Sequence, residues 1–357
     1  MVQASVVVPA YNAEAYIGRA LASVLGQTEP DVEILVVDDA STDRTAALVD
    51  RIAARDPRVR LLRATVNAGP GAARNLGLAQ ARGAWIALLD ADDGFAPERI
   101  AALCTLGERH GADIVADNLL LCTEDGSGAA TPMIPPHLLA APKRMTAAEF
   151  VTGNIGSRRT PRISYGFMHP ILRRSFIAAH GLRYDERNRF GEDFLFYLAC
   201  LARGACWWIT PAPLYHYTVR TGSLTEVQTA ADLLRIRTAE QRLLEDASLR
   251  TDPAFRRALR QHQAGIDRRY YYRAFTDALK GRPLSRALAL LFESRASLRH
   301  IALESATQMP VILHKAMRGG YGRTALPRGD TAGEDEAGRA SKRPHPESSG
   351  PPLPPVR

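Results

Sequence analysis

The chain has 357 residues, of which 46% are hydrophobic and 24% are charged, a composition typical of a folded globular protein with one large domain or two moderate ones. It has neither a continuous apolar run long enough to span a bilayer nor a basic, apolar leader at its start, so we expect no transmembrane helix and no signal peptide. The formal net charge of +8 is compatible with nucleic acid, anionic lipid or anionic substrates, and alone it does not choose among them.

The cysteine pattern bears on the cellular compartment. Cys104, Cys122, Cys200 and Cys206 form no C-x-x-C pair and lie in apolar stretches. This pattern predicts reduced, buried thiols in a cytoplasmic protein rather than disulfides or a zinc site.

The first hundred residues alternate short apolar runs with segments of helical spacing. Strands are predicted at residues 5–8, 33–37, 59–62 and 85–89, and helices at 13–25, from a cap at 41–43 to about 55, and at 71–82. Pro9 is expected to end the first strand, because proline cannot donate to a sheet ladder. The alternation predicts an α/β fold in which a mostly parallel sheet carries helices on both faces.

The fourth apolar run ends abruptly in Asp90, Asp92 and Asp93. Hard divalent cations such as Mg²⁺ or Mn²⁺ prefer oxygen ligands and often link carboxylates to substrate phosphates. The alternative is a solvated acidic turn that caps the following segment. In a parallel sheet, however, this turn should meet Tyr11 and Asp39 at one edge, where nucleotides commonly bind. Helix-capping acids and a packing tyrosine remain the alternative for those two residues.

Four segments in order carry a family resemblance: SVVVPAYN at residues 5–12, ILVVDDASTD at 34–43, NAGPGAARNLG at 67–77 and DADD at 90–93. Together they resemble the family 2 glycosyltransferases of the GT-A fold. The resemblance implies a nucleotide-diphosphate sugar donor, usually a UDP-sugar, a divalent metal (Mn²⁺ or Mg²⁺), and inversion at the anomeric carbon. It also implies the following donor-side roles: Pro9, Tyr11, Asn12 and Glu14 line the nucleotide, Asp39 meets the base, Arg74 lies near the donor, Asp90 contacts its ribose or sugar, and Asp92 binds the metal.

The middle of the chain is expected to supply the acceptor side. Residues 118–146 are rich in glycine and proline and are interpreted as a loop or hairpin insertion. Glu192 and Asp193 begin an apolar helix that runs to about residue 202, where acids are also favoured by the helix dipole alone. By the resemblance, Asp193 is the general base that takes the proton of an acceptor hydroxyl, and Glu192 orients the site.

The segment YHYTVRTGS at residues 215–223 resembles the family segment that closes the donor site. The resemblance gives Arg220 a contact with the diphosphate and His216 a contact with the diphosphate or the metal, although a histidine between tyrosines is often only a packed strand residue. The chain lacks the Gln-x-x-Arg-Trp segment and the transmembrane helices of processive members, which favours transfer of a single sugar.

The last third is predicted to be helical and then disordered. Residues 268–273, with the sequence RRYYYR, invite a nucleic-acid interpretation, but no nucleic-acid-binding motif accompanies them and a solvated basic helix face explains them. Basic residues between apolar ones over 286–323 are compatible with an anionic membrane surface, which would place the protein at the inner face of the cell membrane. From residue 328 onward, low hydrophobicity and many prolines, glycines and charges predict a disordered tail.

Together these observations predict a catalytic domain at residues 1–225, a helical region at 226–325 and a tail at 326–357. The expected function is transfer of one hexose, with UDP-glucose as the type of donor, to a hydroxyl of a glycan or lipid-linked acceptor in surface or exopolysaccharide assembly. The alternatives are a sugar nucleotidyltransferase, whose glycine-rich, basic N-terminal signature is missing here, and a non-catalytic module that binds nucleotide-sugars or glycans.

Overall fold

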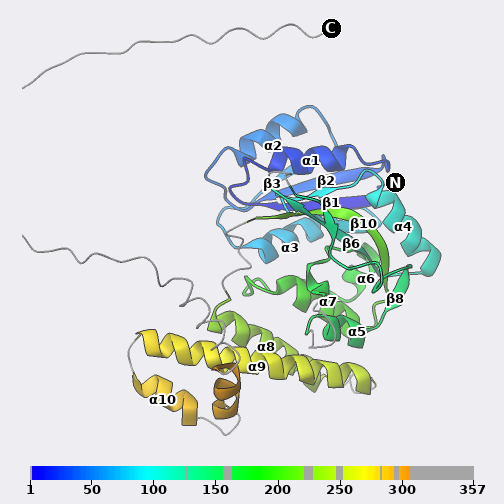
Figure 1. The fold of residues 1–357 in the computed structure, drawn as a ribbon. Helices are drawn as coiled ribbons and strands as arrows, with labels where there is room; N and C mark the ends of the chain where they lie inside the picture. The colour runs from blue at the N-terminus through cyan, green and yellow to red at the C-terminus, as the bar shows by residue number, and fades with distance from the viewer. Residues whose placement is uncertain are drawn as a thin grey trace, which may run out of the picture. The chain divides into compact units, whose positions relative to one another are not determined.

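The computed structural model describes residues 2–124, 128–155, 163–220, 228–246, 252–281, 284–292 and 297–305. All of them belong to one compact unit, residues 1–308 (Figure 1). The strands are β1 (Ala4–Ala10), β2 (Val32–Asp38), β3 (Val59–Arg63), β4 (Trp85–Leu88), β5 (Gly94–Phe95), β6 (Ile114–Thr123), β7 (Thr131–Pro132), β8 (Lys143–Met145), β9 (Ile171–Arg173) and β10 (Trp207–Val219). The helices are α1 (Ile17–Leu25), α2 (Thr45–Ala53), α3 (Pro70–Gln80), α4 (Arg99–His110), α5 (Ala147–Gly153), the 3₁₀ turn η1 (Tyr165–Phe167), α6 (Arg174–Ala179), α7 (Glu192–Ala202), α8 (Ala230–Glu245), α9 (Pro253–Gly281) and α10 (Leu284–Phe292), and residues 297–305 are also helical.

These strands form one sheet in the order β3-β2-β1-β4-β9-β6-β10-β5, with β7 beside β6 and β8 beside β10. The first four strands are parallel to one another, as are β6 and β10. Strand β9 is antiparallel to both β4 and β6, between which it lies. The prediction of a mostly parallel sheet with helices on both faces is therefore confirmed, with antiparallel strands added in its second half.

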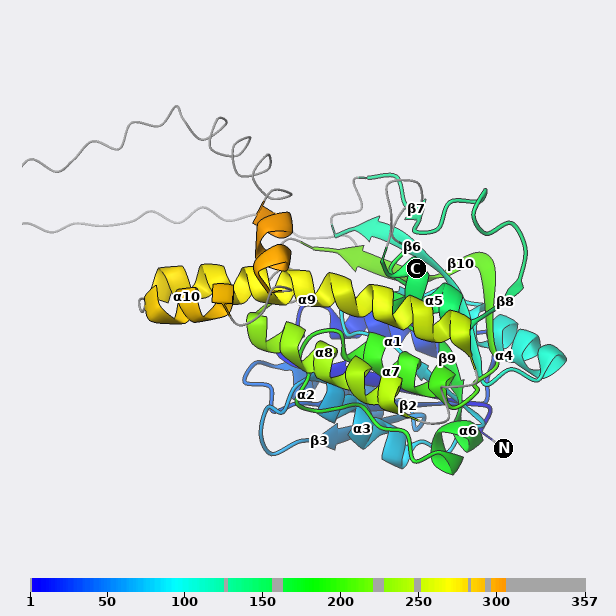
Figure 2. The same ribbon diagram turned by 90° about the horizontal axis from the view of Figure 1, so that it is seen from below.

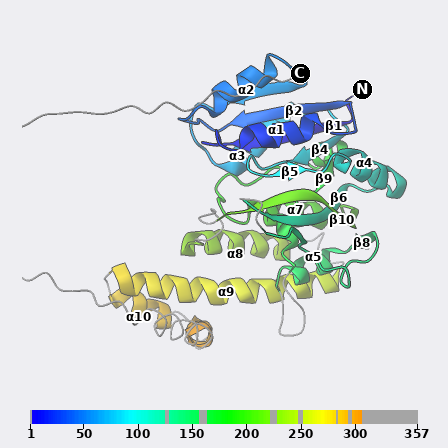
Figure 3. The same cartoon turned by 45° about the horizontal axis from the view of Figure 1, so that its top comes forward.

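Alternating residues of the strands build two separate cores. Val6 and Ile34 pack with α1, α2 and α4 on one face, whereas Val7 and Leu35 pack with α3, α7 and the C-terminal helices on the other. Figure 3 shows α1 and α2 on one side of the sheet and α7, α8 and α9 on the other. This division follows from the two-residue period of a strand that is buried on both faces.

Strand β1 extends beyond the end that Pro9 predicted. The Val7 carbonyl accepts a hydrogen bond from Leu89 on the β4 side, whereas the Ala10 carbonyl accepts one from Asp39 on the β2 side. Pro9 lies two residues after Val7, so its nitrogen also faces the β4 side, where the pairing of β1 with β4 has ended at Leu88. Because β4 no longer pairs there, the missing N–H of Pro9 removes no hydrogen bond between strands, and β1 continues to Ala10.

The helices after β10 pack onto the face of the sheet that carries α7. Helix α9 runs past α5 and α8, and α8 contacts α7 (Figure 2). A capping box of Thr229 and Asp232 starts α8, and another of Thr146 and Glu149 starts α5. The predicted boundary near residue 225 and the predicted tail at 326–357 lie outside the described residues.

The hairpin interpretation of residues 118–146 is confirmed in its described part, where β6 pairs with β7 in antiparallel fashion. All four cysteines are free: Cys104 and Cys200 are buried, but Cys122 and Cys206 are only partly buried. Among the described helices, none is both long enough and apolar enough to cross a membrane.

Candidate active site

The loops after β1 and β2 are joined by side-chain hydrogen bonds. Asn12 donates its backbone N–H to Ser41 at 3.0 Å, and its side-chain oxygen accepts from the Thr42 N–H at 2.8 Å. The Glu14 carboxylate accepts from the backbone and guanidinium N–H groups of Arg44, which lowers the pKa of Glu14. Tyr11 is the first residue of the loop after β1, and half of its surface is exposed. Its ring is therefore available to a planar ligand at this edge.

Asp39 fastens the end of β2 to the start of α3. Its buried carboxylate accepts hydrogen bonds from the backbone N–H groups of Ala68 at 3.0 Å and Gly69 at 2.8 Å. Helix α3 then crosses β1 very closely, since a Cβ built at Gly77 would lie 2.2 Å from Val7 Cγ1. These two contacts fix the direction in which the side chain of Arg74, on the same helix, leaves α3.

Arg74 is buried and joins two segments far apart in the sequence. One guanidinium nitrogen lies 2.9 Å from Asp90 after β4, and the other lies 2.8 Å from Glu192 and 3.3 Å from Asp193 at the start of α7. The guanidinium also faces the ring of Tyr184 at 5.6 Å from its centroid. Three carboxylates thus surround one buried cation, and this excess of negative charge favours a proton or a second cation at the site.

Asp193 is the acid of this group whose pKa is raised. It lies in the first turn of α7, which follows Gly191 in the left-handed region at φ 69°. Burial raises the pKa of Asp193 to about 7, although the charge of Arg74 opposes this rise. A carboxyl group with a pKa near the working pH is suited to general-base catalysis.

The acidic turn after β4 is held by β10. Tyr215 donates its hydroxyl to Asp93 at 2.8 Å, and the Thr218 N–H donates to the other oxygen of the same carboxylate at 2.7 Å. Arg220 pairs with Asp92 at 2.6 Å while its guanidinium lies on the ring of Tyr16 at 4.3 Å. Burial and the charge of Asp90 raise the pKa of Asp92. Asp92 and Arg220 are each about one-third exposed, so a charged ligand can reach this pair.

His169 completes a possible cation site at this turn. Within the described residues, the three-residue group that could hold a metal ion is Asp90, Asp93 and His169, whose ligand atoms lie within 4.8 Å of one another. The Nε2 atom of His169 lies 3.7 Å from Asp90, and burial lowers the pKa of its imidazole to about 4, which keeps the ring neutral and able to bind a metal. Carboxylate oxygens suit Mn²⁺ or Mg²⁺ and neutral imidazole is a common metal ligand, so the residues present fit the implied metal.

The backbone of His216 pairs with Gly94 directly after this turn, but its side chain faces away from the turn. Its neighbour Tyr215 points to Asp93, and successive strand residues point to opposite faces. The charged groups that act on the half-buried His216 are Asp117, Glu98 and Arg99, and burial lowers its pKa. The sequence prediction that His216 contacts the diphosphate or the metal therefore gains no support from its surroundings.

Sequence reasoning also missed residues that the site uses. Tyr184 and Tyr215 contact the charged groups described above, and the alternation of strand residues would have placed Tyr215 and His216 on opposite faces once the strand was assigned, without showing which face carries the site. His169 has no comparable local signal, because β9, which begins two residues later, enters the sheet between β4 and β6. Its carbonyl accepts a hydrogen bond from the buried Arg99 at 2.7 Å, which fixes a backbone that has a φ of 43°.

Comparisons with known proteins agree with this geometry. Residues 5–168 match the model of the family described as glycosyl transferase family 2. The succinoglycan biosynthesis protein ExoO of Rhizobium meliloti (strain 1021) is 34% identical over 303 residues, covering 85% of this chain and 85% of that protein. The succinoglycan biosynthesis protein ExoU of the same organism is also 34% identical, over 82% of this chain and 84% of its own.

Solved structures share the fold. S. aureus TarS 1–349 in complex with UDP superposes with a TM-score of 0.58 and 22% identity, over 79% of this chain and 75% of that one. The complex of the same protein with UDP-GlcNAc also gives 0.58, at 23% identity. Since the chain is 34% identical to ExoO and ExoU over more than four fifths of their length, it belongs to glycosyltransferase family 2 and is a glycosyltransferase of the GT-A fold.

Proposed function

We propose that this glycosyltransferase moves one hexose from a UDP-sugar to a hydroxyl group of a glycan or lipid-linked acceptor. The transfer inverts the configuration at the anomeric carbon. It takes place during exopolysaccharide assembly at the cytoplasmic face of the membrane. The names of ExoO and ExoU support the pathway, and the UDP complexes of TarS support the nucleotide. The observation that carries the chemical part of the proposal is the bridge made by Arg74. It holds Asp90, on the donor side, next to Glu192 and Asp193, on the acceptor side.

On the donor side, the nucleotide occupies the edge formed by the loops after β1 and β2. Tyr11 offers an exposed ring, and Asp39 lies at the end of β2, where the base is expected. This edge also includes Pro9 near the end of β1. Asn12 and Glu14 hold the loop after β1 to the loop after β2 through the hydrogen bonds described above. Arg220 leaves Asp92 to contact the diphosphate, because a doubly charged phosphate competes well with one carboxylate for a guanidinium.

On the acceptor side, Asp193 accepts the proton of the attacking hydroxyl group. The hydroxyl oxygen then forms a bond with the anomeric carbon from the face opposite the leaving group, and the bond from that carbon to the β-phosphate oxygen breaks. Such assistance typically contributes roughly 10²–10⁴-fold in rate. Glu192 shares Arg74 with Asp193 and thereby orients the base.

A divalent cation would be held by Asp92, as the family resemblance implies, and by the neighbouring group of Asp90, Asp93 and His169, whose ligand atoms lie within 4.8 Å of one another. When bound, it supplies positive charge that offsets the charge developing on the leaving diphosphate. Arg220 adds to this stabilisation from the protein itself, as preorganised cations do in phosphate-releasing enzymes.

The test is release of UDP from a panel of UDP-sugars by the purified chain, with Mn²⁺, Mg²⁺ or EDTA. We expect metal-dependent release from one sugar, stimulated by the correct acceptor, and a product of inverted anomeric configuration by NMR. If no UDP-sugar is turned over and calorimetry detects no binding of UDP, the proposal of a UDP-sugar donor is wrong. A product of retained configuration would contradict the role of Asp193 as base.

A further inference from the structure

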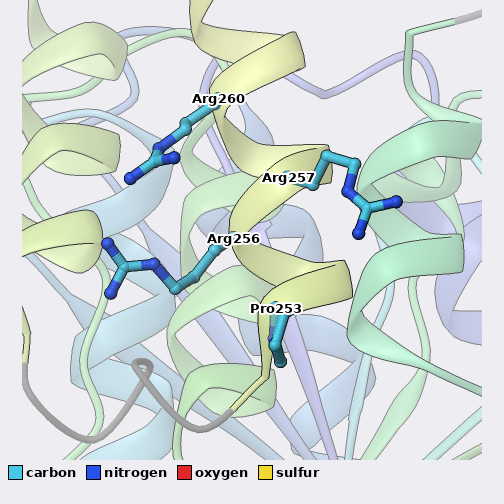
Figure 4. Close-up of a pocket in the computed structure, with 4 residues that line it drawn as sticks. All are labelled: Pro253, Arg256, Arg257 and Arg260. Carbon is cyan, nitrogen blue, oxygen red and sulfur yellow. The ribbon is translucent and has the colours of Figure 1, made fainter.

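The start of α9 carries three arginines around a shallow pocket. Arg256, Arg257 and Arg260 line it together with Pro253, and Figure 4 shows Arg257 extending to one side of the helix and the other two to the opposite side. Arg257 and Arg260 are exposed, and Arg256 is partly buried. Within the part of the chain that the structure describes, none of the three forms an ion pair.

The acids of α9 do not balance these charges. Between residues 253 and 281 the sequence has six arginines and one lysine against two aspartates. Asp267 is paired with Arg237 of α8 at 2.6 Å, and Asp277 is paired with Arg273 at 3.3 Å. The two aspartates within the helix are therefore already paired, and Asp252 just before it accepts hydrogen bonds from the backbone N–H groups of Ala254 and Phe255, so the arginines at its start have no carboxylate partner among the described residues.

Exposed apolar side chains gather on the elements that follow. Of the eleven large hydrophobic residues that are exposed in the described chain, five lie between residues 279 and 303: Leu279, Leu288, Phe292, Leu298 and Leu303. Phe292 at the end of α10 is 80% exposed. Single exposed apolar residues need no explanation, but such a concentration marks a surface that contacts another apolar phase or partner.

The two features lie on the same side of the compact unit. Helix α10 packs against α9, and in Figures 1 and 3 both lie on the side away from the sheet. Figure 2 views this side directly and shows α9 and α10 in front of the other elements. The basic–apolar surface is defined here as Arg256, Arg257 and Arg260 at the start of α9 together with Leu279, Leu288, Phe292 and Leu298, which lie from the end of this 29-residue helix onward.

We propose that the basic–apolar surface docks the enzyme on an anionic phospholipid bilayer. Arginines are attracted to anionic headgroups, while exposed leucine and phenylalanine side chains enter the boundary between headgroups and acyl chains. A two-fold contact between two copies would place this surface against an identical one, which has no carboxylate among its defining residues, so a second copy offers the arginines no counter-charge there. The inference rests on the proposed function in one respect: a lipid-linked acceptor lies in the same bilayer.

Co-sedimentation of the full chain with lipid vesicles tests the proposal. We expect binding to phosphatidylcholine vesicles that contain phosphatidylglycerol, weak binding to phosphatidylcholine alone, and a decrease as salt is raised. The triple variant Arg256→Gln/Arg257→Gln/Arg260→Gln should lower the partition coefficient on the anionic vesicles by about 100-fold, since each basic residue near such a surface contributes roughly 1 kcal/mol. The double variant Leu288→Ser/Phe292→Ser should weaken binding while its salt dependence remains.

A matched control variant distinguishes the effect of this particular surface on vesicle binding from the effect of the net charge of the protein. Arg51, Arg55 and Arg109 are exposed on or beside α2 and α4 and form no ion pair among the described residues. The variant Arg51→Gln/Arg55→Gln/Arg109→Gln removes the same charge and should bind vesicles like the wild type. Equal losses in both triple variants, or no binding of the wild type to anionic vesicles, would overturn the proposal.

The assay also separates this inference from the proposed function. Vesicle binding requires no donor or acceptor, and metal-dependent UDP release without vesicles should be the same in the wild type and in the α9 triple variant. If vesicle binding fails while UDP release persists, only the docking surface is wrong. If the wild type binds vesicles as expected but releases no UDP, the docking surface stands and the proposed donor is wrong.

Discussion

The Arg74 guanidinium lies 3.3 Å from the Asp193 carboxylate, an ion pair that joins α3 to the first turn of α7. Both side chains are buried. Because the same guanidinium also holds Asp90 and Glu192, a change on the donor side alters the charge that the proposed base experiences. This relationship leads to predictions about pH and about substitutions of Arg74.

The first prediction concerns pH. Burial raises the pKa of Asp193 to about 7, and only the ionised carboxylate can accept a proton. The value of kcat/KM for transfer should therefore fall about tenfold per pH unit well below 7 and become constant above it. A pH profile of transfer with a soluble acceptor measures this. A profile that stays flat from acidic to neutral pH would mean that Asp193 is already ionised in the free enzyme.

The second prediction concerns Arg74→Met. Loss of the cation leaves three carboxylates without their shared partner, so the midpoint of the pH profile should move to higher pH and the free energy of unfolding should fall by up to about 3–5 kcal/mol. Denaturant unfolding and the pH profile measure the two effects. Arg82→Met is the control, because Arg82 is exposed and pairs with Glu33 at 2.9 Å, so it should leave the midpoint unchanged. If the midpoint of the pH profile is unshifted in Arg74→Met, the charge of Arg74 does not influence the pKa of the catalytic base.

Local sequence patterns predicted the individual residues of the site but not the contacts between residues from distant segments. Apolar runs that end in polar residues were enough to place Asp39 and Asp90 at one edge of the sheet, because the ends of parallel strands converge. Arg74 and Glu192 are 118 positions apart in the sequence. Their pairing depends on where α7 lies relative to α3, which the hydrophobic periodicity of neither segment predicts.

Two histidines illustrate the same limit. His216 lies in an alternating segment, YHYT, in which both sets of side chains are suited to either face, so its sequence does not fix which face it occupies. His169 approaches Asp90 because β9 enters the sheet antiparallel between β4 and β6, an insertion that only the complete topology reveals.

The third prediction distinguishes donor binding from chemistry. Asp92→Asn should weaken metal-dependent binding of UDP, because it removes the carboxylate proposed to hold the metal. Asp193→Asn should leave that binding intact and lower the transfer rate by roughly 10²–10⁴-fold. Calorimetry of UDP with Mn²⁺ or EDTA, together with transfer assays, measures both. Near-full activity of Asp193→Asn would show that another group is the base.

The fourth prediction compares the two histidines as metal ligands. His169 belongs to the group of possible ligands at the acidic turn, whereas His216 lies among Asp117, Glu98 and Arg99. His169→Gln should weaken Mn²⁺ binding by at least about tenfold, and His216→Gln should leave it unchanged. Titration of free Mn²⁺ by electron paramagnetic resonance measures this without any turnover. The reverse order of effects would restore His216 as the ligand that the sequence predicted.

The fifth prediction concerns the close crossing of α3 and β1, which sets the position of Arg74. A Cβ at Gly77 would lie 2.2 Å from Val7 Cγ1, so Gly77→Ala forces the helix away from the strand and should lower the free energy of unfolding by about 1–3 kcal/mol. Gly18→Ala in α1 is the matched control, because a Cβ at Gly18 would have no neighbouring atom within 4 Å and alanine favours the helix by about 1 kcal/mol. Denaturant unfolding of both variants compares them. Since a displaced α3 also carries Arg74 away from Asp193, Gly77→Ala should lower transfer more than it lowers UDP binding, whereas Gly18→Ala should change neither.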